Sequence, residues 1–145
     1  MLKALLVAAL LTIATPALAQ TAADVDKQID TVLGPHAIYA TAIKTIQEAL
    51  AAHDVAALSG YIGYGETMRV NGAETVIADE EDLSARFDQI FNAKVVAAVT
   101  AQPYETLFVN QDGIMFGTGE LWINGICDDE ACEFPFVTII AVNNQ

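Results

Sequence analysis

The chain has 145 residues and is strongly acidic, with nineteen Asp and Glu against six Lys and Arg and a formal net charge of −13. This charge argues against binding to nucleic acid or to anionic membrane surfaces, which attract basic patches. The sequence holds no internal repeat, low-complexity segment or second domain, and its length suits one domain with a real core.

The first nineteen residues have the pattern of a cleavable export signal. Lys3 gives a positive start, residues 4–14 form an apolar run, and Ala17-Leu18-Ala19 is a small-x-small cleavage site. The run is shorter than the roughly 20 residues that span a bilayer. We therefore expect cleavage between Ala19 and Gln20 and a mature domain of residues 20–145 in the periplasm or outside the cell, without stable membrane insertion. A short amino-terminal anchor is the alternative.

Two helices are expected at the start of the mature chain. Residues 24–33 are amphipathic and end at Gly34-Pro35, and Pro35 suits the first turn of a second helix that runs to about Ala52. Apolar residues recur in that helix at 3.6-residue spacing. Asp54 is a good N-cap for a short helical turn over residues 55–58.

The middle of the chain predicts a hairpin followed by a helix. Residues 59–70 indicate an irregular strand, Asn71-Gly72 is a hairpin signal, and residues 74–78 form the return strand. The acids of residues 79–82 suit the positive end of the next helix. We expect residues 92–101 to continue that helix after a kink.

Three strands are expected in the last third of the chain, over residues 104–109, 114–127 and 132–142, with Asp112-Gly113 as the first turn. Alternation along the long strand predicts two faces. One face would carry Ile114, Phe116, Thr118, Glu120 and Trp122, and the other Met115, Gly117, Gly119, Leu121 and Ile123. The last strand is apolar on both faces, which favours helices on one side and a second copy of the sheet on the other.

Cys127 and Cys132 are the only cysteines. In an exported protein such a pair predicts a disulfide, here closing a hairpin near its tip and contributing about 2 kcal/mol. A redox switch is the alternative, although the spacing departs from Cys-x-x-Cys. No His lies near enough in sequence to complete a zinc site.

The order of elements predicts an α+β domain in which a curved antiparallel sheet wraps around about three helices. Residues 49–58, ALAAHDVAAL, and the strand from Gly113 to Asn124 resemble the nuclear transport factor 2-like (SnoaL-like) superfamily, whose cone-shaped fold has cystatin-like topology. Residues 113–123 also resemble small exported bacterial proteins of unassigned function. The resemblance covers most of the mature chain.

The superfamily resemblance implies a fold and leaves the function open, because the superfamily includes isomerases, dehydratases, ligand binders and interaction domains. Its enzymes often use an Asp–His or Tyr–Asp pair inside the cone, and the sequence shows no clean counterpart. The weak catalytic candidates are Glu120, Asp112 and His53. Glu120 is interpreted as a solvated carboxylate at an interface rim or a carboxylate in a pocket, and His53 as a titratable group or an exposed helix end.

Aromatic residues are the candidates for binding. Tyr61, Tyr64 and Trp122 are the candidates for lining a ligand site, although the two tyrosines are first interpreted as core packing. The candidate interface comprises Phe116, Trp122, Phe134 and Phe136. The same aromatic stripe also fits a pocket wall or core packing.

The acidic clusters at residues 79–82 and 128–130 lack the spacing of a calcium loop, so no metal and no cofactor is expected. The prediction is an exported, non-catalytic module that binds a protein partner or a small molecule, with a homodimer through the sheet as one form. The alternative is a cone-pocket isomerase, lyase or hydrolase. In that enzyme Glu120 or Asp112 would act as the base and Tyr61 or Tyr64 as the hydrogen-bond donor.

Overall fold

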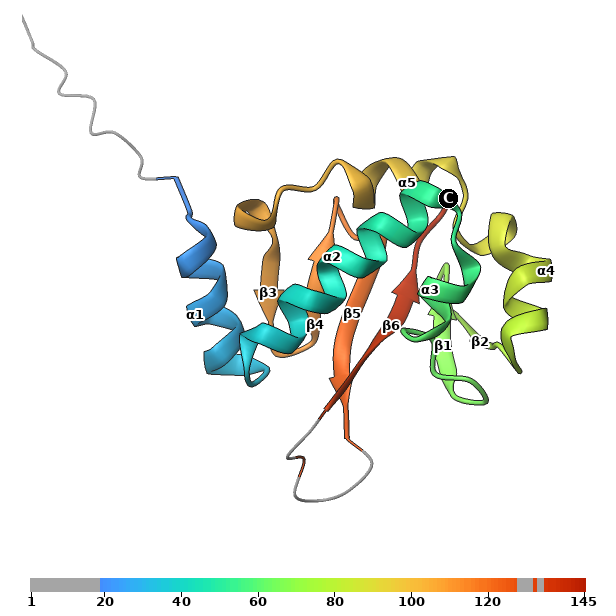
Figure 1. Ribbon diagram of the computed structural model, residues 1–145, viewed down its shortest axis with the longest axis horizontal. Helices are drawn as coiled ribbons and strands as arrows, with labels where there is room; N and C mark the ends of the chain where they lie inside the picture. Colours follow the sequence, from blue (N-terminus) through green and yellow to red (C-terminus); the bar gives the residue numbers. More distant parts are fainter. Residues whose placement is uncertain (1–18, 128–131, 133–134) are drawn as a thin grey trace, which may run out of the picture.

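The computed structural model describes residues 19–127, 132 and 135–145. The expected export signal, apart from Ala19, lies outside the described residues, as do Phe134 and the acids of residues 128–130. The described chain is α+β, as predicted, with an open, curved six-stranded sheet and five α-helices (Figure 1).

The helices are α1 (Ala22–Val32), α2 (His36–Ala52), α3 (Val55–Ser59), α4 (Glu80–Ile90) and α5 (Ala93–Thr100), with a 3-10 turn η1 (Tyr104–Thr106). The strands are β1 (Thr67–Val70), β2 (Ala73–Val76), β3 (Phe108–Asn110), β4 (Gly113–Phe116), β5 (Leu121–Ile126) and β6 (Phe136–Val142).

Side-chain caps set the helix starts close to where the sequence places them. Asp54 accepts from the backbone N–H of Ala57 and begins α3, and Asp79 accepts from Asp82 and begins α4. Helix α1 starts two residues earlier than expected, because Thr21 and Asp24 form a reciprocal capping box. Such caps satisfy N–H groups that have no partner within the helix.

Two expected elements have a different form. The kinked helix predicted to run on through residues 92–101 is two helices, since Phe91 leaves helical geometry and Asn92 caps α5 through the N–H of Val95. The strand predicted at residues 104–109 begins only at Phe108, after the η1 turn. The irregular strand predicted from residue 59 is regular only in β1.

The sheet has the strand order β2-β1-β6-β5-β4-β3. Neighbouring strands are antiparallel except β1 and β6, which are parallel, so the prediction of a wholly antiparallel sheet was wrong at this junction. The last strand therefore lies inside the sheet, between the β1–β2 hairpin and β5. The Asn71-Gly72 turn forms as predicted and joins β1 to β2.

The long strand predicted over residues 114–127 is a hairpin. Gly117 and Gly119 adopt positive φ values of 63° and 120°, where residues with side chains are strained, and the chain reverses over residues 117–120. The four turn residues make Met115 the partner of Trp122 and Phe116 the partner of Leu121. The faces predicted beyond Phe116 were therefore wrong: Thr118 and Glu120 lie in the turn, and Trp122 shares the face of Met115. Leu121 and Ile123 share the face of Phe116 and Ile114.

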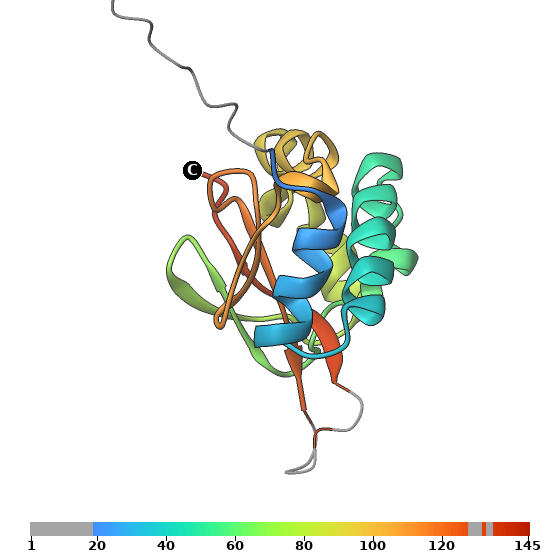
Figure 2. The same ribbon diagram turned by 90° about the vertical axis from the view of Figure 1, so that its left-hand side faces the viewer.

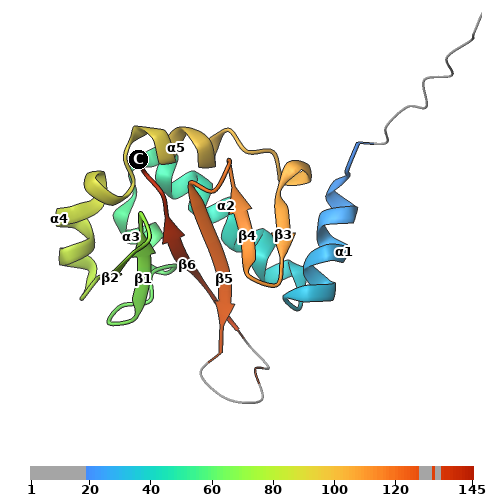
Figure 3. The same cartoon turned by 180° about the vertical axis from the view of Figure 1, so that it is seen from behind.

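One face of the sheet packs against the helices and forms the core. Ile114, Phe116, Leu121 and Ile123 are all fully buried there, with Ile139 next to them on β6. Figure 1 shows α2 crossing this face, and Figure 3 shows the opposite face with the strands in front of the helices. None of the described helices covers that second, open face (Figure 3).

The disulfide is formed as predicted. Cys127 and Cys132 are bonded, with their Cα atoms 5.1 Å apart, beyond the end of β5. Strand β6 begins at Phe136 and not at Cys132 as expected.

Candidate functional site: a hollow on the open face of the sheet

A single row of register partners crosses the open face from one edge of the sheet to the other. In order of strands from β3 to β2, the row consists of Phe108, Met115, Trp122, Ala141, Arg69 and Glu74. Its first four members are apolar and its last two carry opposite charges. The ring of Phe108, 49% exposed, meets the indole of Trp122 edge to face with centroids 6.3 Å apart.

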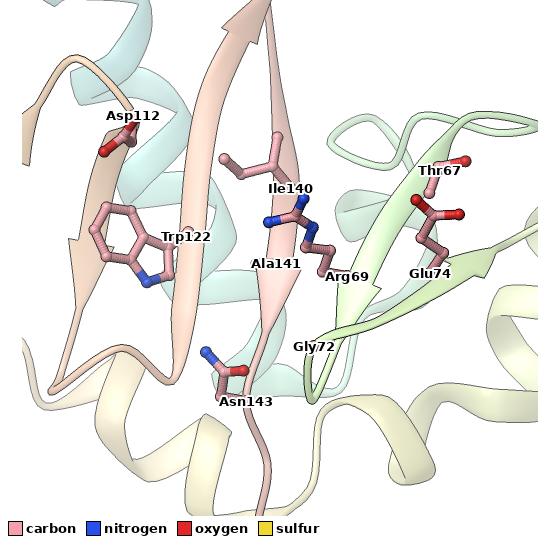
Figure 4. A pocket seen from close by; sticks show the side chains of 9 residues that line it. All are labelled: Thr67, Arg69, Gly72, Glu74, Asp112, Trp122, Ile140, Ala141 and Asn143. Carbon is pink, nitrogen blue, oxygen red and sulfur yellow. The ribbon is translucent and has the colours of Figure 1, made fainter.

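The middle of this row forms the floor of a hollow of about 600 Å³, which we call the open-face hollow. Figure 4 shows Trp122 and Asp112 on one side of β6 and the β1–β2 hairpin on the other. The hollow is lined by Thr67, Arg69, Gly72, Glu74, Asp112, Trp122, Ile140, Ala141 and Asn143.

A bulge in β6 adds to the apolar floor. Ile123 pairs with Ile139 and Trp122 pairs with Ala141, so Ile140 is an extra residue between them. Both Ile140 and Ala141 line the hollow. The wall comes from the β1–β2 hairpin, which extends away from the helices (Figure 2).

Arg69 is the basic residue of the hollow, and it makes no ion pair with any described residue. By contrast, Arg86 pairs with Asp82 at 3.2 Å, and Lys94 lies 3.5 Å from Glu120. Glu74 is the cross-strand partner of Arg69, yet the guanidinium leans toward Ile140 and away from that carboxylate (Figure 4). Arg69 thus places a positive charge next to the apolar floor in a chain of strongly negative net charge.

Glu120 is not at a solvated rim, and it does not line the open-face hollow. It is 9% exposed and closes the β4–β5 turn, where its carboxylate accepts from the backbone N–H of Thr118 at 2.6 Å. That N–H and, less strongly, the Lys94 ammonium hold the pKa of Glu120 below its ordinary value of 4.5. The carboxylate is therefore held ionised by its own turn.

The residues of the enzyme hypothesis do not come together in the described structure. Asp112 lies at the β3–β4 turn, at the opposite end of the hairpin from Glu120. The hydroxyl of Tyr64 is 2.7 Å from Ser59 Oγ, and Tyr61 lies in a different groove, of about 430 Å³. No hydrogen bond joins either tyrosine to either carboxylate among these residues.

His53 stands at the C-terminal end of α2 in left-handed conformation, with φ of 53°. Its ring packs on Phe87 with centroids 4.2 Å apart, and its Nδ1 lies 3.6 Å from the exposed Asp88 carboxylate. His53 thus has the surroundings of an exposed helix end, which is one of the two interpretations drawn from the sequence.

The four candidate interface residues are dispersed. Phe116 is fully buried in the core beneath the helices, so it belongs to no exposed surface. Phe136 is 61% exposed and lines the second groove with Tyr61, away from Trp122 and the open-face hollow. Phe134 lies outside the described residues.

Sequence reasoning missed two features. Tyr104 donates to Asp26 Oδ1 at 2.7 Å, and burial together with this carboxylate raises the pKa of Tyr104. The two residues are 78 positions apart and no motif links them. Arg69 was also missed, since an arginine on a short strand is usually solvated. Its only sequence signal was its place in a hairpin strand of an acidic chain.

Within the described part of the chain, no group of three or more His, Cys, Asp or Glu residues could hold a metal ion. Nor does any helix there have the length and apolar character needed to cross a membrane. Comparison with protein-family models, curated proteins and solved structures finds no match to the chain.

Proposed function

We propose that the protein is an exported, non-catalytic binding module that holds a small organic molecule in the open-face hollow. The observation that carries this proposal is the partly buried indole of Trp122 in the same hollow as an arginine that has no ion-pair partner among the described residues. Ligand sites are typically concave and mostly apolar with a few placed polar groups, and measure about 300–1,000 Å³. The open-face hollow, at about 600 Å³, falls in that range.

Export is part of the proposal. It is supported by the signal pattern of residues 1–19 and by the disulfide between Cys127 and Cys132, because disulfides persist in oxidising compartments. The nuclear transport factor 2-like cone is also proposed. Helices ahead of a first hairpin, four later strands and a curved sheet support it. In this chain the space between sheet and helices is occupied by core side chains, which favours a site on the opposite face.

The absence of catalysis is proposed because the carboxylates and tyrosines of the enzyme hypothesis are separated. Glu120 is engaged by Thr118, and Tyr64 by Ser59. A general base must lie within hydrogen-bond reach of the proton that it removes, or one water away. None of the four pairings of these acids and tyrosines is joined by a hydrogen bond among the described residues.

Native mass spectrometry of the protein recovered from producing cells tests the proposal. A monomer with a small-molecule adduct in wild type, which disappears in Trp122→Ala and persists in Phe136→Ala, supports binding in the open-face hollow. Phe136 is the matched control because it is an exposed aromatic residue in the other groove. An adduct lost only in Phe136→Ala would contradict the proposal.

A homodimer through the open face is the second candidate. It is favoured by the exposed Phe108 at the end of the apolar row, since a ligand in the hollow alone would leave that ring in water. A bare dimer in the mass spectrum that becomes monomeric in both Phe108→Ala and Trp122→Ala would select this candidate.

A further inference from the structure

We infer that the open-face hollow selects a small organic monocarboxylate with an apolar body, and that Arg69 pairs with its carboxylate. This inference rests on the proposed function and names the class of ligand. An arginine fork binds a carboxylate through two parallel hydrogen bonds, which gives orientation as well as energy.

The first support is the state of Arg69 itself. Its guanidinium is free of ion pairs with the described residues, although Glu74 is its register partner across the hairpin. The side chain leans over β6 instead, toward the apolar floor (Figure 4). An exposed Arg–Glu pair contributes at most about 1 kcal/mol, so Glu74 competes only weakly with a ligand carboxylate.

The second support is the surface beside the guanidinium. Arg69 pairs in register with Ala141, and Ala141 pairs with Trp122. A molecule whose carboxylate meets Arg69 therefore lays its remaining atoms over Ala141 and Ile140 toward the indole. Aromatic or aliphatic bodies are favoured there, because this floor offers the indole and two aliphatic side chains.

The third support is the sign of the other charges. Glu74 and Asp112 line the same hollow, and the whole chain carries a net charge of −13. A second negative charge on the ligand would meet these carboxylates without a second arginine to offset them. The hollow therefore disfavours dicarboxylates and phosphates, and it favours a ligand with a single negative charge.

The test uses the fluorescence of Trp122, which reports on the hollow because it is the single Trp of the chain. Phenylacetate is the probe, phenylacetamide is its neutral analogue, and phenylmalonate is its dicarboxylate analogue. The expected result is saturable binding of phenylacetate, with about tenfold weaker binding of each analogue. Arg69→Gln should weaken phenylacetate about tenfold and leave phenylacetamide unchanged.

Lys44→Gln is the matched control, since it removes the same charge from an exposed position on α2 whose ion pair with Glu48 is 3.9 Å long. It should bind as wild type does. Equal affinity for phenylacetate and phenylacetamide, unchanged in Arg69→Gln, would overturn the role of Arg69 while the proposed function stands. Fluorescence that changes only with protein concentration would overturn both the role of Arg69 and the proposed function. It would instead favour a second copy of the chain bound to this face.

Discussion

Asn71 and Asn144 exchange two hydrogen bonds: Asn71 Nδ2 donates to Asn144 Oδ1 at 2.8 Å, and the backbone N–H of Asn144 donates to Asn71 Oδ1 at 2.9 Å. The Asn144 side chain also donates to the carbonyls of Gln89 and Ile90. This one residue therefore ties the β1–β2 turn, the end of α4 and the segment after β6 together. The wall of the open-face hollow is held by these contacts.

Asn144→Ala should lower the free energy of unfolding by about 2 kcal/mol, because three side-chain hydrogen bonds are lost and two carbonyls lose their partner. Chemical denaturation measures the change. Asn143→Ala is the control. It removes one exposed hydrogen bond, to the carbonyl of Gly119, and should cost about 0.5 kcal/mol. Equal effects of the two substitutions would contradict this account of the Asn71–Asn144 contact.

Glu120→Gln should lower stability by about 1 kcal/mol at neutral pH, since the charge-assisted hydrogen bond from Thr118 becomes a neutral one. The pKa of Glu120 is lowered in the folded state, so its contribution is present above pH 4.5 and is lost as pH falls through the folded-state pKa. The gap between wild type and variant should therefore close on acidification. Denaturation curves at several pH values measure it, and a gap that is independent of pH would refute the assignment.

Tyr104→Phe should change how the stability of the protein depends on pH in the alkaline range. The pKa of Tyr104 is raised in the folded state by burial and by Asp26, so wild-type stability falls as pH rises above the ordinary tyrosine value of 10.0. The variant lacks this ionisation and should lose less stability over the same alkaline range. At neutral pH it should be about 1 kcal/mol less stable than wild type, because the hydrogen bond to Asp26 is gone. If the stability of wild type and variant fell with the same slope as pH rises, this would argue against a raised pKa of Tyr104.

Gly113→Ala should be strongly destabilising, by about 4 kcal/mol, whereas Gly72→Ala should cost about 1 kcal/mol. Both glycines have positive φ, 136° and 80°. An added Cβ at Gly113 would overlap the carbonyl oxygen of Ile123 on the neighbouring strand, while one at Gly72 meets nothing within 4 Å. Thermal denaturation measures the loss of stability in each variant. Gly113→Ala combines a steric overlap with backbone strain, whereas Gly72→Ala introduces backbone strain alone. Similar losses of stability in the two variants would show that the close approach of β4 and β5 does not determine the cost of Gly113→Ala.

Reduction of the disulfide should lower stability by about 2 kcal/mol, since the bond closes a loop with a sequence separation of 5. The Cys127→Ser/Cys132→Ser variant should match the reduced wild type and should not respond to reductant. A larger loss, with unfolding of β5 and β6, would mean that the sheet depends on this bond.

Local signals in the sequence predicted much of the fold. Asn71-Gly72 predicted its hairpin, and Asp54 and Asp79 predicted the starts of α3 and α4, because each acts within a few residues of its own position. The spacing of Cys127 and Cys132 predicted their bond.

The open-face hollow could not be predicted because it depends on register. The turn at residues 117–120 contains Gly117 and Gly119, which also fit a weakened strand, and continuing the alternation through it placed Trp122 with Phe116 on one face. In the structure they lie on opposite faces. The neighbours of Trp122 come from β6 and β1, and the parallel pairing that brings Arg69 beside Ala141 leaves no local trace in the sequence.

The central claim is that a small molecule binds on the open face of the sheet, and amide NMR titration of the protein tests it most directly. With a library of small carboxylates and their neutral amides, we expect saturable shifts of the Trp122 indole N–H and of amides in β1, β5 and β6. Signals from the helix-facing core, such as those of Tyr39, should stay in place. Saturable shifts confined to residues between helices and sheet, or open-face shifts that follow protein concentration alone, would contradict the claim.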